Sequence, residues 1–317
     1  MDTRVHTLED VLKYRDFFTW YCNRSTTHGL VNKKQKLAEF LSVFEDVGSV
    51  VVLGWRAGVT FRMLGVLRSC VVHKLRSGNT RVHNVLERGF HSILFCPGNK
   101  GHVLTKALGL NVDAVVADFE DAVAPSEKHA ARKTTTDVLR TRAGERTPTV
   151  AIRINDATIT EGEEDIAFLI DEVERSDSHQ WCCDALVLPK CEDPSLVSGV
   201  AQRIGMQIPL WCMIETSRGV LEASRIAALP AVGGLILGSN DLTKSMQGRQ
   251  TATREPLFFA MSTCVTAARA YGKFVVDGVH NDIGDQDGLR RTCAQARDFG
   301  FSGKSLIHPG QVLLQFL

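Results

Sequence analysis

Eight short apolar runs alternate with helix-like stretches from His91 onward, and this repeat constrains the fold more than any other feature of the chain. A short apolar run bounded by turn residues is typical of a strand buried on both faces. Strands that alternate with helices indicate β/α units, and eight such units close a TIM (β/α)8 barrel. We expect the strands at Ser92–Cys96, Ala114–Asp118, Thr149–Ile154, Ala185–Leu188, Leu210–Ile214, Gly234–Leu237, Phe274–Val276 and Lys304–Ile307.

Helices are expected between most of these strands, because apolar side chains recur there at helical spacing. We place them at Lys100–Leu110, Glu161–Arg175, Pro194–Ile204, Arg218–Ala228, Glu255–Tyr271 and Asp287–Phe299. Gly272 and Gly300 follow the last two helices. Glycine suits the position just past a helix end, so both residues support the predicted boundaries.

Three carboxylic acids lie at or just past the end of the second expected strand, at Asp118, Glu120 and Asp121. The ends of parallel strands meet at one rim, and in a TIM barrel that rim carries the chemistry. The residues at or near the other strand ends are Gly98, Arg153 with Asn155, Lys190, Glu215, Asp241, Asp277 and His308. A single loop charge is most often solvated or caps a helix. The recurrence of ionisable residues at one end of the barrel nevertheless favours a functional site there.

Glu215 and Asp241 form the candidate metal site. Carboxylates at the ends of neighbouring strands supply two oxygen ligands and leave positions for water and substrate, which is how Mg²⁺ is usually held. The alternative has similar merit: both acids cap the helices that follow, since Glu215 precedes Thr216 and Ser217, and Asp241 precedes Leu242. No group of cysteine and histidine has zinc spacing.

The composition argues against two classes of partner. The 317 residues carry a formal net charge of +1, whereas a nucleic-acid-binding surface would be expected to be basic. The most apolar N-terminal run, Val47–Trp55, is far shorter than the ~20 residues of a membrane span. We therefore expect no nucleic-acid partner and no membrane partner.

The nine cysteines form no C-x-x-C pair, which favours reduced thiols.

Two segments precede the expected barrel, which occupies residues 90–317. Residues 1–62 contain two helix-like patterns and are interpreted as a partly helical N-terminal extension. Residues 63–89 form a basic linker, in which Met63–Leu86 has no acid and four lysine or arginine residues. This composition resembles a mitochondrial presequence, although it lies inside the chain. It predicts a mitochondrial location, and the alternative is a basic surface linker in a cytoplasmic protein.

Eight blocks of the sequence follow, in order, the pattern of one known family. They are L-F-C-P-G-N-K (Leu94–Lys100), L-N-V-D-A-V-V-A-D-F-E-D-A-V-A (Leu110–Ala124), I-R-I-N (Ile152–Asn155), L-P-K (Leu188–Lys190), M-I-E-T-x-R-G-V (Met213–Val220), G-S-N-D-L-T (Gly238–Thr243), D-G-V (Asp277–Val279) and G-F-S-G-K-S-L-I-H-P-G-Q (Gly300–Gln311). The set resembles the citrate lyase β-chain-like proteins of the HpcH/HpaI aldolase group, and the L-N-V-D-A variant most resembles their mitochondrial citramalyl-CoA lyase branch. The resemblance covers about residues 90–317.

This resemblance implies a magnesium-dependent lyase that cleaves a 3-hydroxyacyl-CoA, of the citramalyl-CoA or malyl-CoA type, to acetyl-CoA and a keto acid. The family is usually homotrimeric. By the matching motifs, Glu215 and Asp241 become the Mg²⁺ ligands and Arg153 becomes the substrate clamp. Glu120 and Asp121 would orient metal-bound water or Arg153. The residues that would line the substrate and CoA site are Phe95, His102, Lys106, Arg153, Glu215, Ile307 and His308.

Two departures from the family pattern bear on activity. His91 stands where the first block usually has arginine, so a basic contact is weakened when the histidine is neutral. The family continues past the I-H-P-x-Q block with a helix and a lid whose aspartate protonates the enolate, whereas this chain stops at Leu317. We therefore expect a barrel with a truncated C-terminal end and no lid. The alternative functions are a thioesterase or malate-synthase-type reaction, and a catalytically silent subunit that binds CoA esters.

Overall fold

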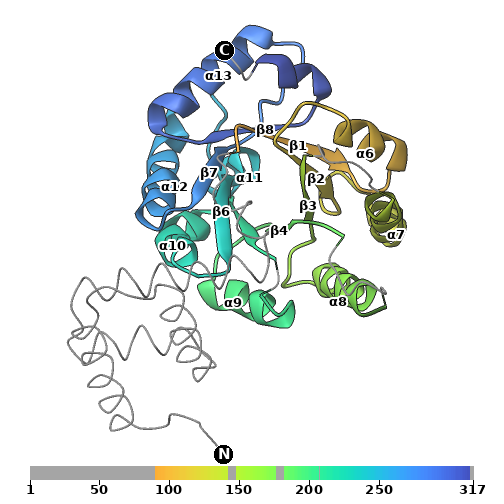
Figure 1. Cartoon of the computed structure of the whole chain (residues 1–317). Helices are drawn as coiled ribbons and strands as arrows, with labels where there is room; N and C mark the ends of the chain where they lie inside the picture. Colours follow the sequence, from red (N-terminus) through yellow and green to blue (C-terminus); the bar gives the residue numbers. More distant parts are fainter. Residues whose placement is uncertain (1–89, 142–147, 176–181, 207, 315–317) are drawn as a thin grey trace, which may run out of the picture. The chain divides into compact units, whose positions relative to one another are not determined.

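The computed structural model describes residues 90–141, 148–175, 182–206 and 208–314 (Figure 1). Within these ranges eight strands form a closed barrel, and every neighbouring pair is parallel in the order β1 to β8. The strands are β1 (Ser92–Pro97), β2 (Ala114–Asp118), β3 (Thr149–Arg153), β4 (Ala185–Leu188), β5 (Leu210–Ile214), β6 (Val232–Leu237), β7 (Phe274–Asp277) and β8 (Gly303–Leu306). The predicted (β/α)8 barrel is confirmed, and its strand ends lie within two residues of the predicted ones.

Helices surround the barrel between consecutive strands (Figure 1). They are α6 (Gly101–Leu108), α7 (Lys128–Arg140), α8 (Thr160–Arg175), α9 (Pro194–Arg203), α10 (Ser217–Ala227), α11 (Ser239–Ser245), α12 (Phe258–Ala270) and α13 (Gln286–Phe299). Three 3-10 turns accompany them: η1 (Pro125–Glu127), η2 (Glu255–Leu257) and η3 (Pro309–Leu314). The predicted helix from Glu255 therefore begins as the separate turn η2.

Two helices, α7 and α11, were not predicted from the sequence. The buried face of α7 includes Arg132, Thr135 and Thr136, so the apolar periodicity that identifies a helix is weak there. Helix α11 has seven residues, and Leu242 is its one large apolar side chain. A segment this short and polar resembles a loop in sequence. The second omission matters for the site, because α11 carries Asp241.

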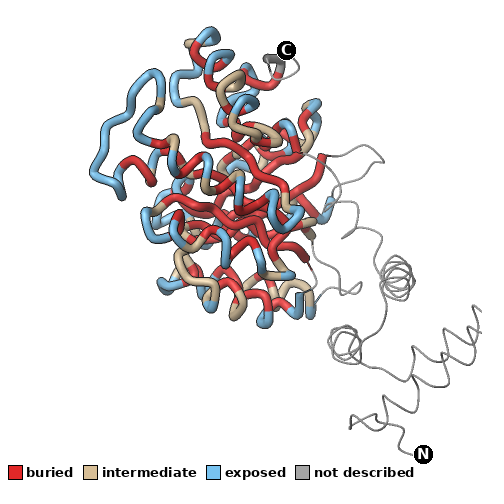
Figure 2. The backbone as a smooth tube through the Cα atoms, turned by 90° about the vertical axis from the view of Figure 1, so that its left-hand side faces the viewer, coloured by how far each residue is buried: buried red, intermediate tan, exposed pale blue. Residues whose placement is uncertain are grey.

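Successive side chains of each strand alternate between the barrel interior and the surrounding helices. Val116 of β2 and Trp211 of β5 belong to the interior cluster. Their neighbours Val115 and Cys212 belong to the larger cluster that packs against the helices. Both faces are therefore buried, which explains the near-continuous apolar strand sequences. Figure 2 shows the buried strands at the centre of the barrel, with exposed residues on the outer helices and loops.

Three aromatic rings fill the amino-terminal end of the barrel interior. The ring centroids of Phe90 and Trp211 are 4.9 Å apart, those of Phe90 and Phe274 are 4.9 Å apart, and those of Trp211 and Phe274 are 5.3 Å apart. Gly234 makes room for this cluster, since a Cβ atom there would stand 2.4 Å from the Phe274 ring. Because these rings close the amino-terminal end of the interior, the mouth of the barrel lies at the carboxyl ends of the strands.

The predicted extension at residues 1–62 and the basic linker at residues 63–89 lie outside the described residues. Within the described ranges, no helix combines the length and the apolar character that a membrane crossing requires. The seven cysteines in those ranges are free thiols, as the sequence predicted. After β8 the chain continues as η3, which ends at Leu314.

Candidate active site

Four strands carry their interior rows of side chains beyond the apolar core into the mouth of the barrel. Phe95, Asp118, Arg153 and Glu215 each stand two residues after an interior core residue, so the alternation of a strand directs all four inward. They line one cleft of about 380 Å³ at the carboxyl ends of the strands. The same cleft is also lined by Asp121, Met213, Asp241 and Ile307. The sequence-predicted residues from six separate motifs thus meet at one place.

Arg153 and Asp118 form a buried bidentate ion pair in this cleft. Strands β2 and β3 are paired so that the two residues are register partners. Arg153 Nε donates to Asp118 Oδ1 at 2.7 Å, and Arg153 Nη2 donates to Asp118 Oδ2 at 2.6 Å. This fork geometry fixes the plane of the guanidinium as well as its position.

Two further carboxylates face the remaining end of the Arg153 guanidinium. Nη1 lies 2.9 Å from Glu120 Oε2 and 3.6 Å from Asp121 Oδ2. The Cζ atom lies 5.4 Å from the centre of the Phe95 ring, which adds a cation–π contact. Burial acts to lower the pKa of Arg153, but Asp118 and the other carboxylates raise it overall, so the group stays charged. Glu120 and Asp121 therefore contact Arg153, as one of the two predicted roles requires.

Glu215 also lines this cleft and is buried, with 2% of its surface exposed. Its Oε1 accepts a hydrogen bond of 2.7 Å from the backbone N–H of Lys190. Burial, followed by the nearby negative charge of Glu120, raises the pKa of Glu215 to about 7. A carboxylate in this environment gains from a cation that compensates its charge.

Asp241 reaches the same cleft from the first turn of α11, directly after β6. In the described part of the chain its carboxylate makes no hydrogen bond and no ion pair, so its oxygens are free to bind a cation. Helix α10 is capped by Thr216, whose Oγ1 accepts from Gly219 N at 3.0 Å, and α11 has no side-chain cap. The capping alternative for Glu215 and Asp241 is therefore wrong.

The donor set suits a hard divalent cation. Over the described residues, no group of three or more Cys, His, Asp and Glu side chains surrounds a common metal position. The protein would then contribute two carboxylates, and water and substrate would complete the shell. This is the usual arrangement for Mg²⁺, which keeps several waters and needs few protein ligands. Glu215 and Asp241 therefore fit a magnesium ion.

Comparison with known proteins decides the family. The family model for HpcH/HpaI aldolase/citrate lyase matches residues 91–309. The chain belongs to this family. A (3S)-malyl-CoA thioesterase of Cereibacter sphaeroides is 40% identical over 223 residues, which cover 70% of this chain and 74% of the relative. The mitochondrial citramalyl-CoA lyase of Mus musculus is 28% identical over 261 residues, which cover 76% of this chain and 74% of the relative.

Solved structures of the HpcH/HpaI family have the same fold. The crystal structure of CitE from Mycobacterium tuberculosis, in complex with magnesium, acetoacetate and coenzyme A, matches with a TM-score of 0.61 and 29% identity. The match covers 73% of this chain and 80% of that chain. Magnesium is thus a cofactor of structural neighbours in this family, in agreement with the magnesium predicted from the sequence.

Three residues predicted to contact the substrate or CoA do not line the cleft. His102 and Lys106 are exposed on α6, and His308 is exposed just after β8. Phe95, Arg153, Glu215 and Ile307 do line it. The roles of the three exposed residues toward a CoA chain stay predictions.

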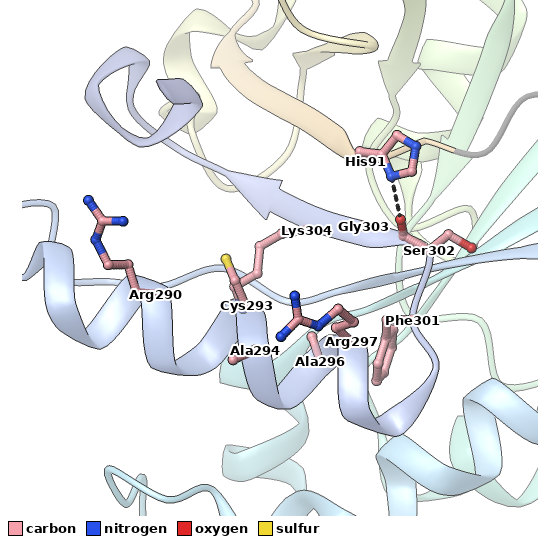
Figure 3. A pocket seen from close by; sticks show the side chains of 10 residues that line it. All are labelled: His91, Arg290, Cys293, Ala294, Ala296, Arg297, Phe301, Ser302, Gly303 and Lys304. Atoms are coloured by element: carbon pink, nitrogen blue, oxygen red, sulfur yellow. Dashed lines mark hydrogen bonds between the residues drawn. The ribbon is translucent and has the colours of Figure 1, made fainter. Parts of the chain in front are cut away.

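His91, the first departure from the family pattern, lies away from this cleft. It stands at the amino-terminal end of β1, where its Nδ1 donates to Ser302 O at 3.1 Å. Figure 3 shows it facing the start of β8, beside the groove along α13 that Cys293 and Arg297 also line. The change from arginine to histidine therefore affects the end of the barrel opposite to the candidate active site.

Two residues of the site, Asp118 and Lys190, were not assigned a role from the sequence. Asp118 was recognised as one of three acids, but the pairing that joins it to Arg153 depends on the register of β2 and β3. Lys190 was recognised only as a charge after the fourth strand. The structure places its ammonium group against Glu120 and its backbone N–H against Glu215. The L-P-K motif was the available signal for Lys190.

Proposed function

We propose that this member of the HpcH/HpaI family cleaves the carbon–carbon bond of a 3-hydroxyacyl-CoA of the citramalyl-CoA or malyl-CoA type, giving acetyl-CoA and a keto acid. The observation that carries the proposal is the arrangement of the free Asp241 carboxylate and the buried Glu215 in the same cleft as a fixed Arg153 guanidinium. Glu215 and Asp241 would hold Mg²⁺, which as a Lewis acid polarises the oxygens of the hydroxy acid or keto acid.

Arg153 supports the part of the reaction that develops negative charge on the thioester. When the carbon–carbon bond breaks, the hydroxyl loses its proton and becomes the carbonyl of the keto acid. The electron pair of the broken bond passes to the acetyl thioester, which becomes an enolate and then takes a proton on carbon. A guanidinium held rigidly by Asp118 and Glu120 can donate hydrogen bonds to that enolate oxygen without reorganising.

A thioesterase is the second candidate function, because relatives named (3S)-malyl-CoA thioesterase are 39–40% identical to this chain. In that reaction water attacks the thioester carbonyl, the C–S bond breaks, and free CoA leaves with the intact hydroxy acid. Arg153 would then stabilise the oxygen of the tetrahedral intermediate. The two reactions share the cleft and differ in the bond that is broken.

The products separate these functions. Purified protein with Mg²⁺ and citramalyl-CoA or malyl-CoA should release a keto acid, measured as its phenylhydrazone, without releasing a free thiol. Release of thiol without keto acid would assign the thioesterase.

Asp241→Asn should lower the rate by at least ~10-fold, because the metal loses one of two protein ligands. Asp137→Asn, an exposed change on α7, is the matched control and should act like wild type. The homotrimer implied by the family resemblance stays a prediction, which sedimentation can measure.

A further inference from the structure

Lys190 contacts both halves of the candidate active site. It follows β4 at the rim of the barrel, with its side chain 35% exposed. Its backbone N–H donates to Glu215 Oε1 at 2.7 Å. Its ammonium group forms an ion pair with Glu120, whose other oxygen lies 2.9 Å from Arg153 Nη1. One residue thus links a proposed metal ligand to the guanidinium that faces the thioester.

The backbone of Lys190 adopts a conformation that does not favour lysine. Its φ is +48°, in the left-handed region where a Cβ atom is crowded and where glycine is the usual residue. A glycine at this position would make the same backbone hydrogen bond to Glu215 without that cost. The lysine is therefore explained by its side chain, which holds Glu120.

The ion pair with Glu120 differs from an ordinary surface pair. The Glu120 side chain is 8% exposed, and it lies between two cationic groups, Lys190 and Arg153. If the Lys190 ammonium were removed, Arg153 would be the one cationic partner left for the Glu120 carboxylate among the described residues. It could then rotate, and Arg153 would lose one of the contacts that fix Nη1.

We propose that Lys190 is a positioning residue that fixes Arg153 through Glu120, and that sets this group relative to the metal carboxylate Glu215. The inference rests on the proposed function and adds a residue to it. The Lys190 side chain would act on the orientation of the guanidinium and would not be needed for metal binding, because the backbone N–H to Glu215 does not depend on the side chain. Loss of the ammonium should therefore lower kcat while Mg²⁺ binding persists.

Three variants separate the roles of the backbone and the side chain. Lys190→Gly keeps the backbone N–H, relieves the left-handed strain and removes the ammonium. Lys190→Met keeps a side chain of similar length without charge, and Lys190→Arg keeps the charge. Met206→Gly is the matched control, since Met206 also has a positive φ, of +52°, and lies exposed after α9, away from the cleft.

We expect kcat to fall about 10- to 100-fold in Lys190→Gly and Lys190→Met, with little change in KM. Calorimetric Mg²⁺ affinity should be unchanged or tighter, because a nearby positive charge has been removed. The melting temperature of Lys190→Gly should not decrease, as in Met206→Gly, and Lys190→Arg should recover most of the activity. A wild-type kcat in Lys190→Met would overturn the inference. So would parallel losses of kcat, Mg²⁺ affinity and melting temperature in Lys190→Gly.

A spectroscopic measurement tests the inference apart from the proposed function. If the wild-type chain forms neither keto acid nor free thiol, the proposed function fails. The ¹⁵N resonance of the Arg153 side-chain Nε–H then decides the role of Lys190. It should shift in Lys190→Met and stay in place in Met206→Gly. An unchanged Arg153 resonance in Lys190→Met would show that Lys190 does not position the guanidinium.

Discussion

Gly238 lies directly against Glu215. A Cβ atom on Gly238 would stand 2.4 Å from both Cβ and Oε2 of Glu215, closer than real Cβ contacts allow. The φ of Gly238 is −90°, so its backbone is open to any residue, and the requirement for glycine is one of space. The residue that follows β6 therefore makes room for a carboxylate that follows β5.

Gly238→Ala should weaken Mg²⁺ binding about 10- to 100-fold. The added methyl group must push Glu215 away, and the shifted carboxylate can no longer share a metal with Asp241 in the same geometry. Calorimetric titration with Mg²⁺ measures the effect. Gly199→Ala is the control, because a Cβ atom there has nothing within 4 Å. Unaltered affinity in Gly238→Ala would argue against Glu215 as a metal ligand.

Asp118→Asn should destabilise the fold by about 3 kcal/mol, since it leaves a buried guanidinium without its bidentate partner. Urea unfolding gives the free energy. Glu222→Gln provides the comparison: it removes an ion pair of 2.8 Å with Arg225, whose side chain is 73% exposed. That surface pair should contribute less than about 1 kcal/mol. Equal losses in the two variants would mean that the Arg153–Asp118 pair has no special structural role.

The barrel could be predicted because its strands are buried on both faces, which makes apolar runs such as Ala114–Asp118 visible in the sequence. Helix α7 could not, because Arg132 occupies its buried face, where it pairs with Asp165 at 2.6 Å. The candidate metal carboxylates were found from their positions after β5 and β6. Their surroundings were not, since the contacts of Lys190 depend on a backbone angle that no local pattern encodes.

The basic segment Met63–Leu86, which lies outside the described residues, gives a prediction about location. Placed at the N-terminus of a fluorescent reporter, it should direct the reporter to mitochondria, because it is acid-free and carries four lysine or arginine residues. Residues 1–86 should do so less well, since seven acids precede the segment. Fluorescence microscopy with a mitochondrial marker compares the two fusions. Equal import would show that the preceding residues do not mask a signal, and import of neither would favour the basic-linker alternative.

The raised pKa of Glu215 predicts how metal-free protein responds to pH. The folded state holds this proton up to about pH 7, whereas the unfolded chain releases it near the ordinary value of 4.5. Between these values the folded state binds more protons, so its stability falls as pH rises, by up to about 3 kcal/mol in total. The glutamine in Glu215→Gln cannot ionise, so the unfolding free energy of this variant should lack this part of the pH dependence. The difference in unfolding free energy between the wild type and the variant therefore isolates the contribution of Glu215.

Magnesium should reverse this loss in the wild-type protein. The ion binds the ionised carboxylate, so it should stabilise the fold most above pH 7, and stability should increase with the logarithm of Mg²⁺ concentration once the site is saturated. Urea unfolding between pH 5 and pH 8, with and without Mg²⁺, measures both effects. Glu215→Gln should show a much smaller response to the ion, because an amide offers a weaker ligand without charge. A Mg²⁺ response that is the same in both proteins at pH 8 would place the metal elsewhere.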